Sequence, residues 1–319
     1  MQRRTFVVAS GVAAGAFALG GQAVRAADKK ALTLVTNGSS DFWTFARRGI
    51  EKAQKELPNY DMSIHVLAEA TAAEQRRVLD DLLTKGVAGI SVSVNDPAYE
   101  TEILNKVASQ AVLFTTDSDA ANTKRVLYIG TDNVAAGEEC GKLIKKALPN
   151  GGTIMLFVGI PGAANAQERV KGIRKSLEGT KIQILDIRSD EVDFAKAKRN
   201  AEDTLTKYPD ISALVGLWSY NTPQIVEAVK AGGRAGQVKI IGFDEDPVTL
   251  RGIADGLVEG TVVQQPYEFG YQSMVLLAKY IEGDRSFIPA NGLKIIPTKI
   301  VDKSNVADFQ KMMKEMLGK

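Results

Sequence analysis

Two widely separated stretches of the sequence end an apolar run in a cluster of carboxylates. Residues 112–119 read Val-Leu-Phe-Thr-Thr-Asp-Ser-Asp, and residues 238–247 read Val-Lys-Ile-Ile-Gly-Phe-Asp-Glu-Asp-Pro. A short apolar run that stops at polar residues is typical of a buried parallel strand opening into a loop. Because ligands of open α/β sheets bind outside the carboxyl ends of the strands, the two stretches indicate two sheets facing one cleft.

Strands and helices are expected to alternate along the chain after about residue 30. The expected strands cover residues 32–36, 62–67, 87–94, 111–115, 126–130, 153–158, 181–187, 213–217, 238–242 and 261–264. The expected helices cover residues 41–57, 71–85, 133–148, 164–177, 194–207, 222–231, 247–255 and 267–282, with one more opening at residues 96–97. This alternation predicts right-handed parallel crossovers, and therefore an α/β protein with two doubly wound parallel-sheet domains.

The sequence contains no low-complexity linker between the two domains. We therefore expect the chain to cross between them several times, near residues 131–132, 264–266 and 289–293. The expected N-terminal lobe is 30–131 plus 265–290, and the expected C-terminal lobe is 132–264 plus 291–319. Several crossings make a multi-strand hinge with the cleft between the lobes.

The first 26 residues have the three-part pattern of a secretory signal peptide. Arg3 and Arg4 precede an apolar run from Phe6 to Gly21, and small residues stand before Ala27. This pattern predicts an exported, periplasmic protein whose signal is cleaved near Ala26. The apolar run is short and rich in glycine, unlike a membrane-spanning helix. The paired arginines fit either the Tat or the Sec export route.

Charge and residue counts exclude several classes of protein. The chain has 40 basic and 38 acidic residues, and loss of the three arginines of the predicted signal leaves 37 and 38. A net charge near zero gives no support for nucleic-acid binding, so we predict no nucleic-acid partner. One cysteine allows no internal disulfide, and the single histidine, His65, is the only candidate for a metal cluster or a Ser-His-Asp triad. We therefore predict no catalytic residue, no metal and no cofactor.

Polar and aromatic side chains gather just past the ends of the expected strands. They are Asn37, Asp41, Phe42, Trp43, Ser93, Asn95, Asp117, Asn165, Arg169, Phe194, Trp218, Asn221, Asp244 and Gln264. Carboxylates and amides exchange hydrogen bonds with hydroxyl groups, and flat aromatic faces pack on the C–H faces of a sugar ring. A phosphate site would use lysines and glycine-rich backbone, which these loops lack. The pattern predicts a ligand-binding site for a sugar or polyol.

Each of these residues also has a structural interpretation. Asp41, Asp117, Asp132 and Asp244 could be helix caps or turn residues. Phe42 and Trp43 could be core residues of the first helix. The convergence of about eight strand ends favours the binding interpretation. Since neighbours on a helix point about 100° apart, we expect at least one of the two aromatic rings to face the ligand rather than the core.

The sequence resembles the ribose-binding type of periplasmic solute-binding protein, the exported component of ABC sugar importers, over essentially the whole chain after the signal. The segments that carry the resemblance are Asn37 with Asp41–Trp43, Ile90–Pro97, Phe114–Asp119, Tyr128–Asn133, Asn165–Gly172, Ile241–Asp244 and Val263–Pro266.

The resemblance implies a LacI-like core and a monomer that captures a monosaccharide by hinge closure and delivers it to an ABC permease in the inner membrane. The family's ring-stacking aromatics fall on Phe42, Trp43 and Phe194, its carboxylates on Asp117 and Asp244, its arginine on Arg169, its hinge glutamine on Gln264, and its amide loop on Trp218 and Asn221. Ribose binders carry an arginine in place of Ser118, another near the aligned Lys196, and an asparagine in place of Ser93. These departures favour a different monosaccharide or a polyol over ribose.

Three other functions are compatible with parts of this pattern. LacI-type regulators share the core but carry a DNA-binding segment where this chain has its export signal. An exported carbohydrate-active enzyme could use Asp117 and Asp244, provided that the carboxylates lie about 5–9 Å apart. A sugar sensor for a membrane receptor would bind the same ligands. Turnover of a glycoside would distinguish the enzyme from the binding protein.

Overall fold

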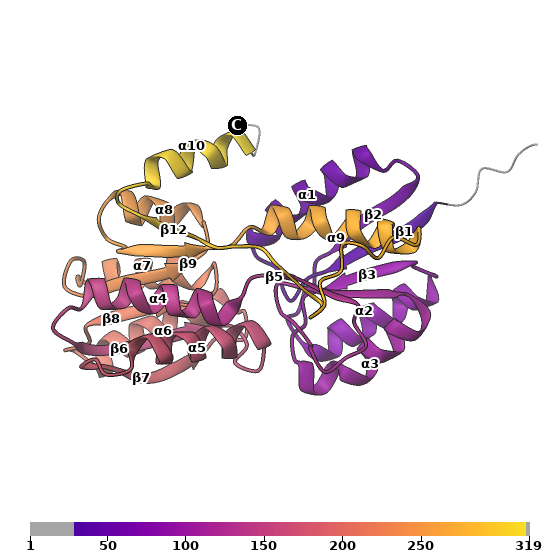
Figure 1. The fold of residues 1–319 in the computed structure, drawn as a ribbon. Helices are drawn as coiled ribbons and strands as arrows, with labels where there is room; N and C mark the ends of the chain where they lie inside the picture. The colour runs from indigo at the N-terminus through magenta and orange to yellow at the C-terminus, as the bar shows by residue number, and fades with distance from the viewer. Residues whose placement is uncertain (1–28, 317–319) are drawn as a thin grey trace, which may run out of the picture.

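The computed structural model describes residues 29–316, so the predicted signal peptide lies outside the described residues. Two lobes lie side by side, each built on a six-stranded sheet with helices on both faces (Figure 1). The predicted class, two doubly wound α/β domains, is confirmed.

The first lobe contains a fully parallel sheet with the strand order β11-β5-β4-β3-β1-β2. Its strands are β1 (Lys30–Val35), β2 (Tyr60–His65), β3 (Gly89–Val92), β4 (Val112–Thr116), β5 (Leu127–Gly130) and β11 (Leu293–Ile295). Its helices are α1 (Phe42–Glu56), α2 (Ala72–Thr84), α3 (Pro97–Gln110) and α9 (Pro266–Ile281). Helix α9 returns from the second lobe and lies beside α1 (Figure 1).

The second lobe repeats this strand order as β12-β10-β9-β8-β6-β7. Its strands are β6 (Gly152–Val158), β7 (Ile182–Ser189), β8 (Ala213–Gly216), β9 (Lys239–Phe243), β10 (Gly260–Val263) and β12 (Lys299–Asp302). Its helices are α4 (Asn133–Ala147), α5 (Ala164–Leu177), α6 (Phe194–Lys207), α7 (Asn221–Ala231), α8 (Pro247–Ala254) and α10 (Val306–Met316). Strand β12 alone runs antiparallel to its neighbour, β10.

Each lobe contains one pair of helices in very close contact. A Cβ atom at Gly49 of α1 would lie 2.0 Å from the carbonyl oxygen of Tyr267 at the start of α9. A Cβ atom at Gly172 of α5 would lie 2.0 Å from the carbonyl oxygen of Val134 in α4. Only glycine permits these approaches, which press α1 against α9 and α4 against α5.

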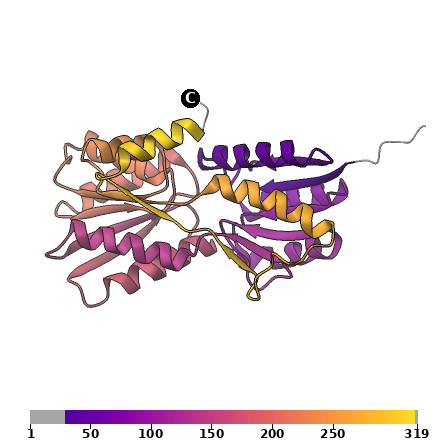
Figure 2. The ribbon, with the colours of Figure 1, turned by 45° about the horizontal axis from the view of Figure 1, so that its top comes forward.

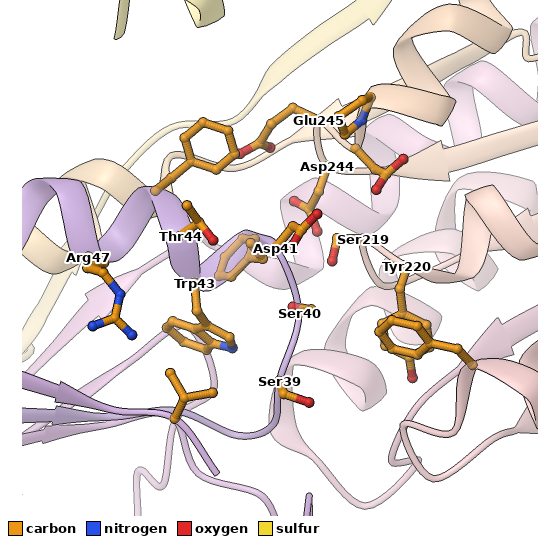
Figure 3. Close-up of a pocket in the computed structure, with 16 residues that line it drawn as sticks. Ser39, Ser40, Asp41, Trp43, Thr44, Arg47, Ser219, Tyr220, Asp244 and Glu245 are labelled. Atoms are coloured by element: carbon orange, nitrogen blue, oxygen red, sulfur yellow. The ribbon is translucent and has the colours of Figure 1, made fainter. Parts of the chain in front are cut away.

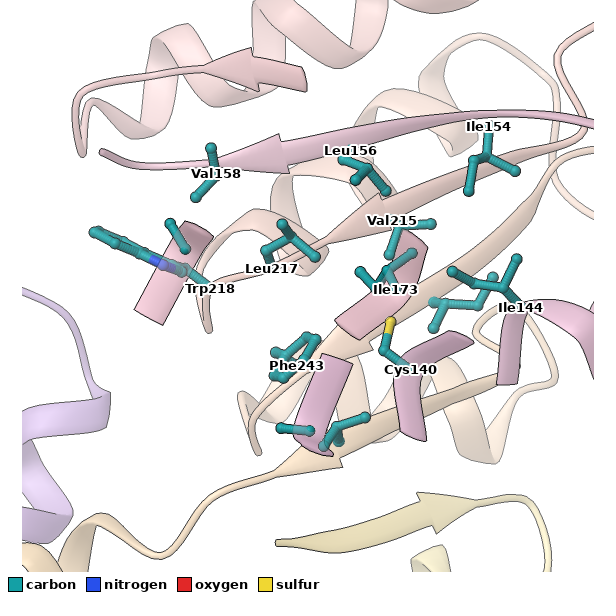
Figure 4. Close-up of a cluster of buried hydrophobic side chains, with 14 of the residues drawn as sticks. Cys140, Ile144, Ile154, Leu156, Val158, Ile173, Val215, Leu217, Trp218 and Phe243 are labelled. Carbon is teal, nitrogen blue, oxygen red and sulfur yellow. The ribbon is translucent and has the colours of Figure 1, made fainter. Parts of the chain in front are cut away.

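The apolar core of the second lobe reaches the edge of the cleft. The cluster between the sheet and helices α4 and α5 includes Ile144 and Cys140 and continues through Val215 and Leu217 to Trp218 (Figure 4). Trp218 therefore belongs to the core and also stands at the carboxyl end of β8.

The chain passes between the lobes at three places. These are residues 131–132 between β5 and α4, residues 264–265 between β10 and α9, and residues 296–298 between β11 and β12 (Figure 2). The expected C-terminal lobe resumes at residue 291, and this boundary is wrong, because β11 pairs with β5 and residues 293–295 therefore lie in the first sheet. No element is expected after residue 282, whereas the structure has β11, β12 and α10 there. The two strands are short and partly exposed and lack an apolar run.

No helix among residues 29–316 has the length and apolar character to cross a membrane.

Candidate functional site

Two aspartates stand at equivalent strand ends in the two lobes. Asp117 follows β4 and Asp244 follows β9, with φ angles of 59° and 65° in the left-handed region. This conformation is uncommon for a residue with a side chain and often marks a functional position. Neither aspartate caps a helix, so the capping interpretation is wrong for both, whereas Asp132 does cap α4. Asp41 stands at the N-cap of α1 without a side-chain capping bond.

Asp117 is buried and accepts hydrogen bonds from both lobes. Its Oδ2 accepts from Ser93 Oγ at 2.7 Å, from Asn37 Nδ2 at 3.4 Å and from Asn165 Nδ2 at 3.3 Å. Because Asn165 belongs to α5, the last of these bonds crosses the cleft. Burial raises the pKa of Asp117, and the positive charge of Arg169 opposes that rise.

Asp244 is equally buried and is held by the hinge glutamine. Its Oδ1 accepts from the backbone N–H of Gln264 at 3.4 Å and from Gln264 Nε2 at 3.2 Å. Burial raises the pKa of Asp244 to about 6, Arg169 lowers it, and the carboxylate of Asp117 adds to the rise. The two carboxylates of different lobes therefore repel each other across the cleft.

Arg169 supplies the positive charge between them. Its guanidinium is 1% exposed, donates through Nε to Asn133 Oδ1 at 2.9 Å and through Nη1 to the carbonyl of Leu217 at 2.6 Å. The group also lies 4.4 Å from the centre of the Phe243 ring. These contacts fix the arginine and stabilise the negative charges beside it.

Four buried polar atoms in the deep part of the cleft have no partner among the described residues. They are Asn165 Oδ1, Arg169 Nη2, Trp218 Nε1 and Gln264 Oε1. All four residues line one deep pocket together with Asp117 and Asp244. Buried polar groups normally make hydrogen bonds. Two donors and two acceptors without partners match a ligand that both donates and accepts, as hydroxyl groups do.

The deep pocket opens into an outer cavity of about 340 Å³ between the lobes. The loop before α1 and the first turn of that helix form one wall, and the loops after β8 and β9 form the other (Figure 3). The residues that line both the deep pocket and the outer cavity are Ser39, Ser40, Phe42, Trp43, Ser219, Tyr220 and Asp244.

Phe42 and Trp43 belong to the core and to the cleft at once. They are 7% and 3% exposed, meet edge to face at 5.0 Å, and pack in the apolar cluster of the first lobe. Both rings pack in the core and also line the cleft, so the expectation that one ring would face the ligand instead of the core is wrong. The first turn of α1 lies where the core ends at the carboxyl edge of the sheet, so the same rings serve both.

Eleven of the fourteen predicted site residues line the deep pocket or the outer cavity. The three that do not are Ser93, Asn95 and Asn221. Ser93 donates to Asp117 from behind, and Asn221 donates to Asp190 at 2.8 Å. Asn95 is buried, and its side-chain amide has no partner among the described residues.

Four residues that line both cavities are absent from the predicted site: Tyr220 and Ser219 on the second lobe, and Ser39 and Ser40 on the first. Tyr220 stands between two predicted site residues, Trp218 and Asn221, and its ring stacks on Phe194 at 4.6 Å. An aromatic residue in a loop already assigned to the site was the available signal. Within residues 29–316 no group of three or more histidine, cysteine, aspartate or glutamate side chains could hold a metal ion.

Comparisons with known proteins agree on one family. A sequence model described as "Periplasmic binding protein domain" matches residues 31–285. The ribose import binding protein of Bacillus subtilis is 27% identical over 249 residues, covering 76% of this chain and 79% of that protein. The D-galactose/methyl-galactoside binding periplasmic protein of Haemophilus influenzae is 27% identical over 332 aligned residues, covering 96% and 97%.

Two crystal structures have the same fold. An ABC transporter solute-binding protein of Burkholderia graminis in complex with D-arabinose has a TM-score of 0.81 and 25% identity, covering 87% of this chain and 97% of that one. A glucose-galactose binding protein of Geobacillus stearothermophilus has a TM-score of 0.81 and 28% identity, covering 87% and 98%.

Proposed function

The chain belongs to the periplasmic binding protein family, and we propose that it is the solute-binding component of an ABC sugar importer. In this proposal it captures a monosaccharide between its lobes and delivers it to a membrane permease. The relatives described above are binding proteins for ribose and galactose, which supports a monosaccharide as the ligand.

One observation carries the proposal: the deep pocket combines four unpartnered polar atoms with two carboxylates from different lobes. A monosaccharide brings several hydroxyl groups in a small volume, so it can satisfy donors and acceptors on both walls. Such a ligand contacts Asp117 and Asp244 together only when the lobes are close. Binding therefore favours the closed form through its better contacts in that state.

The charges of the cleft favour an uncharged ligand. Five carboxylates line the two cavities, against the two guanidinium groups of Arg47 and Arg169. The five are Asp41, Asp117, Asp244, Glu245 and Asp246. An anionic sugar phosphate or uronic acid would be repelled by this excess of negative charge.

We further propose that the protein is exported to the periplasm, works as a monomer and releases its ligand unchanged. The predicted signal peptide supports export. Mass analysis of the amino terminus of the periplasmic protein should find a chain that begins near Ala27. A cytoplasmic chain that retains Met1 would contradict this localisation.

A thermal-shift screen of residues 27–319 tests the ligand class. The panel includes D-ribose, D-arabinose, D-galactose, D-glucose, D-xylose, their polyols and ribose 5-phosphate. A ligand at 100 times its dissociation constant stabilises the fold by about 2.7 kcal/mol. We expect a neutral sugar to stabilise the protein and to be recovered unchanged, and the phosphate to have no effect. A panel without any stabilising sugar would contradict the proposal.

A further inference from the structure

A third buried aspartate stands behind the wall of the cleft. Asp190 follows β7, is 0% exposed and lines neither the deep pocket nor the outer cavity. Its Oδ1 accepts from the hydroxyl of Tyr220 and from the backbone N–H of Val192 at 2.9 Å, and its Oδ2 accepts from Asn221 Nδ2 at 2.8 Å. A buried carboxylate is costly unless it is fully hydrogen-bonded, and both oxygens here have partners.

The backbone around Asp190 is held in an unusual conformation. Glu191 and Val192, which follow it, have φ angles of 57° and 64°, in the left-handed region that side chains rarely adopt. For the β-branched Val192 this conformation is strained. The strain is kept in a turn whose N–H group bonds the carboxylate and whose Val192 side chain lines the deep pocket.

Tyr220 connects Asp190 to the cleft, because its hydroxyl bonds Asp190 and its ring lines the cavities. Its ring lines both cavities (Figure 3). The ring stacks on Phe194 with planes 17° apart and meets Trp218 edge to face at 6.4 Å. Its hydroxyl, however, donates to a carboxylate that lines neither cavity. Tyr220 therefore presents its ring, and not its hydroxyl, to the ligand.

Gly159 at the end of β6 makes room for this arrangement. A Cβ atom at this position would lie 2.6 Å from the Tyr220 hydroxyl oxygen and 2.4 Å from the ring of Trp218. Three features therefore surround the Tyr220 phenol: a glycine that leaves room for it, a strained turn and a buried carboxylate.

We propose that Asp190 is a positioning residue that withdraws the Tyr220 hydroxyl from the cleft, so that Tyr220 acts as an apolar specificity determinant for the bound sugar. With Asp190 in place, this wall accepts a C–H face of the ligand. Without the carboxylate, the phenol can turn its hydroxyl toward the ligand and the wall becomes polar. This inference rests on the proposed function for its ligand, but the geometry that it predicts exists in the free protein.

The first experiment needs no sugar. In a Trp43→Phe background Trp218 is the only tryptophan, and its emission reports on the neighbouring Tyr220 ring. We expect Asp190→Ala, which removes both acceptor oxygens, to shift the Trp218 emission maximum by several nanometres. The same substitution in a Tyr220→Phe background should cause no further shift, because that variant has no hydroxyl to release. An unchanged emission in Asp190→Ala would overturn the proposal whether or not a sugar ligand is known.

The second experiment is a double-mutant cycle for sugar affinity, measured by calorimetry with the best sugar of the panel. We expect Asp190→Ala to weaken binding about tenfold, and Tyr220→Phe to bind nearly as well as the unchanged protein, because it keeps the apolar ring and has no hydroxyl to release. The double variant should also bind nearly as well, since Tyr220→Phe removes the group through which Asp190 acts. A tenfold loss that persists in the double variant would mean that Asp190 acts on binding independently of the Tyr220 hydroxyl and would overturn the proposal. Intact affinity with reduced folding stability would mean that Asp190 is only structural.

Asp193→Ala is the matched control. Asp193 lies three residues along the chain and caps α6 by accepting from the backbone N–H of Lys196. Among the described residues its side chain makes no hydrogen bond with Tyr220. We expect it to leave both the Trp218 emission and the sugar affinity unchanged. An equal effect of Asp193→Ala would assign the changes to general loosening of this segment and would overturn the positioning role.

Discussion

The carboxyl ends of β4 and β9 have the same backbone but hold their aspartates differently. In each lobe the aspartate has a left-handed φ, and its N–H donates to the neighbouring strand, to Ile129 at 3.3 Å or to Val262 at 2.9 Å. Asp117 accepts from three side chains, one of them across the cleft, whereas within residues 29–316 Asp244 accepts only from the hinge residue Gln264. The duplicated fold supplies the position, and the neighbouring side chains decide what each carboxylate does.

This difference suggests separate tasks for the two aspartates. Asp117 links the lobes through Asn165 in the structure itself, so it contributes to closure as well as to ligand binding. Asp244 has fewer protein partners, so more of its hydrogen-bonding capacity is left for a ligand. The predictions below test how far the two lobes are equivalent.

The largest effect is expected from the two tryptophans, one in each lobe. Trp43 and Trp218 are 3% and 7% exposed and each belongs to the apolar core of its lobe. Substitution of either by alanine should lower the free energy of unfolding by about 3–5 kcal/mol and weaken sugar binding as well. Denaturant unfolding and calorimetry measure the two effects.

Phe194→Ala is the control for the tryptophan variants, because Phe194 is 40% exposed. We expect it to weaken binding with little loss of stability. If Trp43→Ala lost affinity alone and Trp218→Ala lost stability alone, the two lobes would not share this arrangement of core and cleft.

The next effect concerns the aspartates themselves. Asp117→Ala and Asp244→Ala should each cost about 1.5–3 kcal/mol of sugar-binding free energy, since each removes a charge-assisted hydrogen bond. The loss should be larger for Asp117, because three protein donors also lose their acceptor. Calorimetry on the folded variants decides this order. Equal losses would show that the bond to Asn165 adds nothing to closure.

Much of this architecture could be predicted from the sequence, and the exceptions have physical causes. The apolar runs that end in carboxylates at Asp117 and Asp244 identified both sheets and the cleft, because a buried parallel strand appears in the sequence as a short run of consecutive apolar residues. The partner sheet of β11 is set by long-range pairing and has no local signal. Asp190 and Tyr220 were missed for a similar reason, since their bond joins loops 30 residues apart.

A smaller effect is expected from the close helix pairs. Gly49→Ala in the first lobe and Gly172→Ala in the second should each lower stability by about 1–3 kcal/mol, because the added methyl group meets a carbonyl oxygen. Gly283→Ala cannot serve as the control, because Gly283 has a φ of 98°, at which any side chain is strained. Ala111→Gly, which lies at the end of α3 and outside the two close helix pairs, gives the size of an alanine–glycine exchange without such a contact. A large loss in one lobe and none in the other would break the structural equivalence of the two helix pairs.

The smallest effect is a pH dependence that the two aspartates should not share equally. Asp244 has a pKa raised to about 6 by burial, whereas an aspartate in an unfolded chain titrates near 3.9. The folded protein therefore binds this proton more tightly than the unfolded chain. The resulting contribution to stability is fully present below about pH 4 and is lost as the pH rises through about 6.

Sugar binding should have the opposite dependence, because a ligand hydroxyl donates its hydrogen bond to the ionised carboxylate. We expect affinity to fall below about pH 6. Because the binding of a single proton to Asp244 opposes sugar binding, the fall is at most tenfold per pH unit. Calorimetry between pH 5 and 8 measures the profile, and Asp244→Asn should flatten it. Asp190 also has a pKa raised to about 6 by burial, so Asp190→Asn must be measured too and should keep the profile if Asp244 is its source. The only histidine, His65, lies exposed on β2 and lines neither cavity, so His65→Gln should likewise leave the profile unchanged. A profile that survives in Asp244→Asn would assign the proton to another group in the cleft, and Asp117, which faces Asp244 across Arg169, would then be the carboxylate that governs binding.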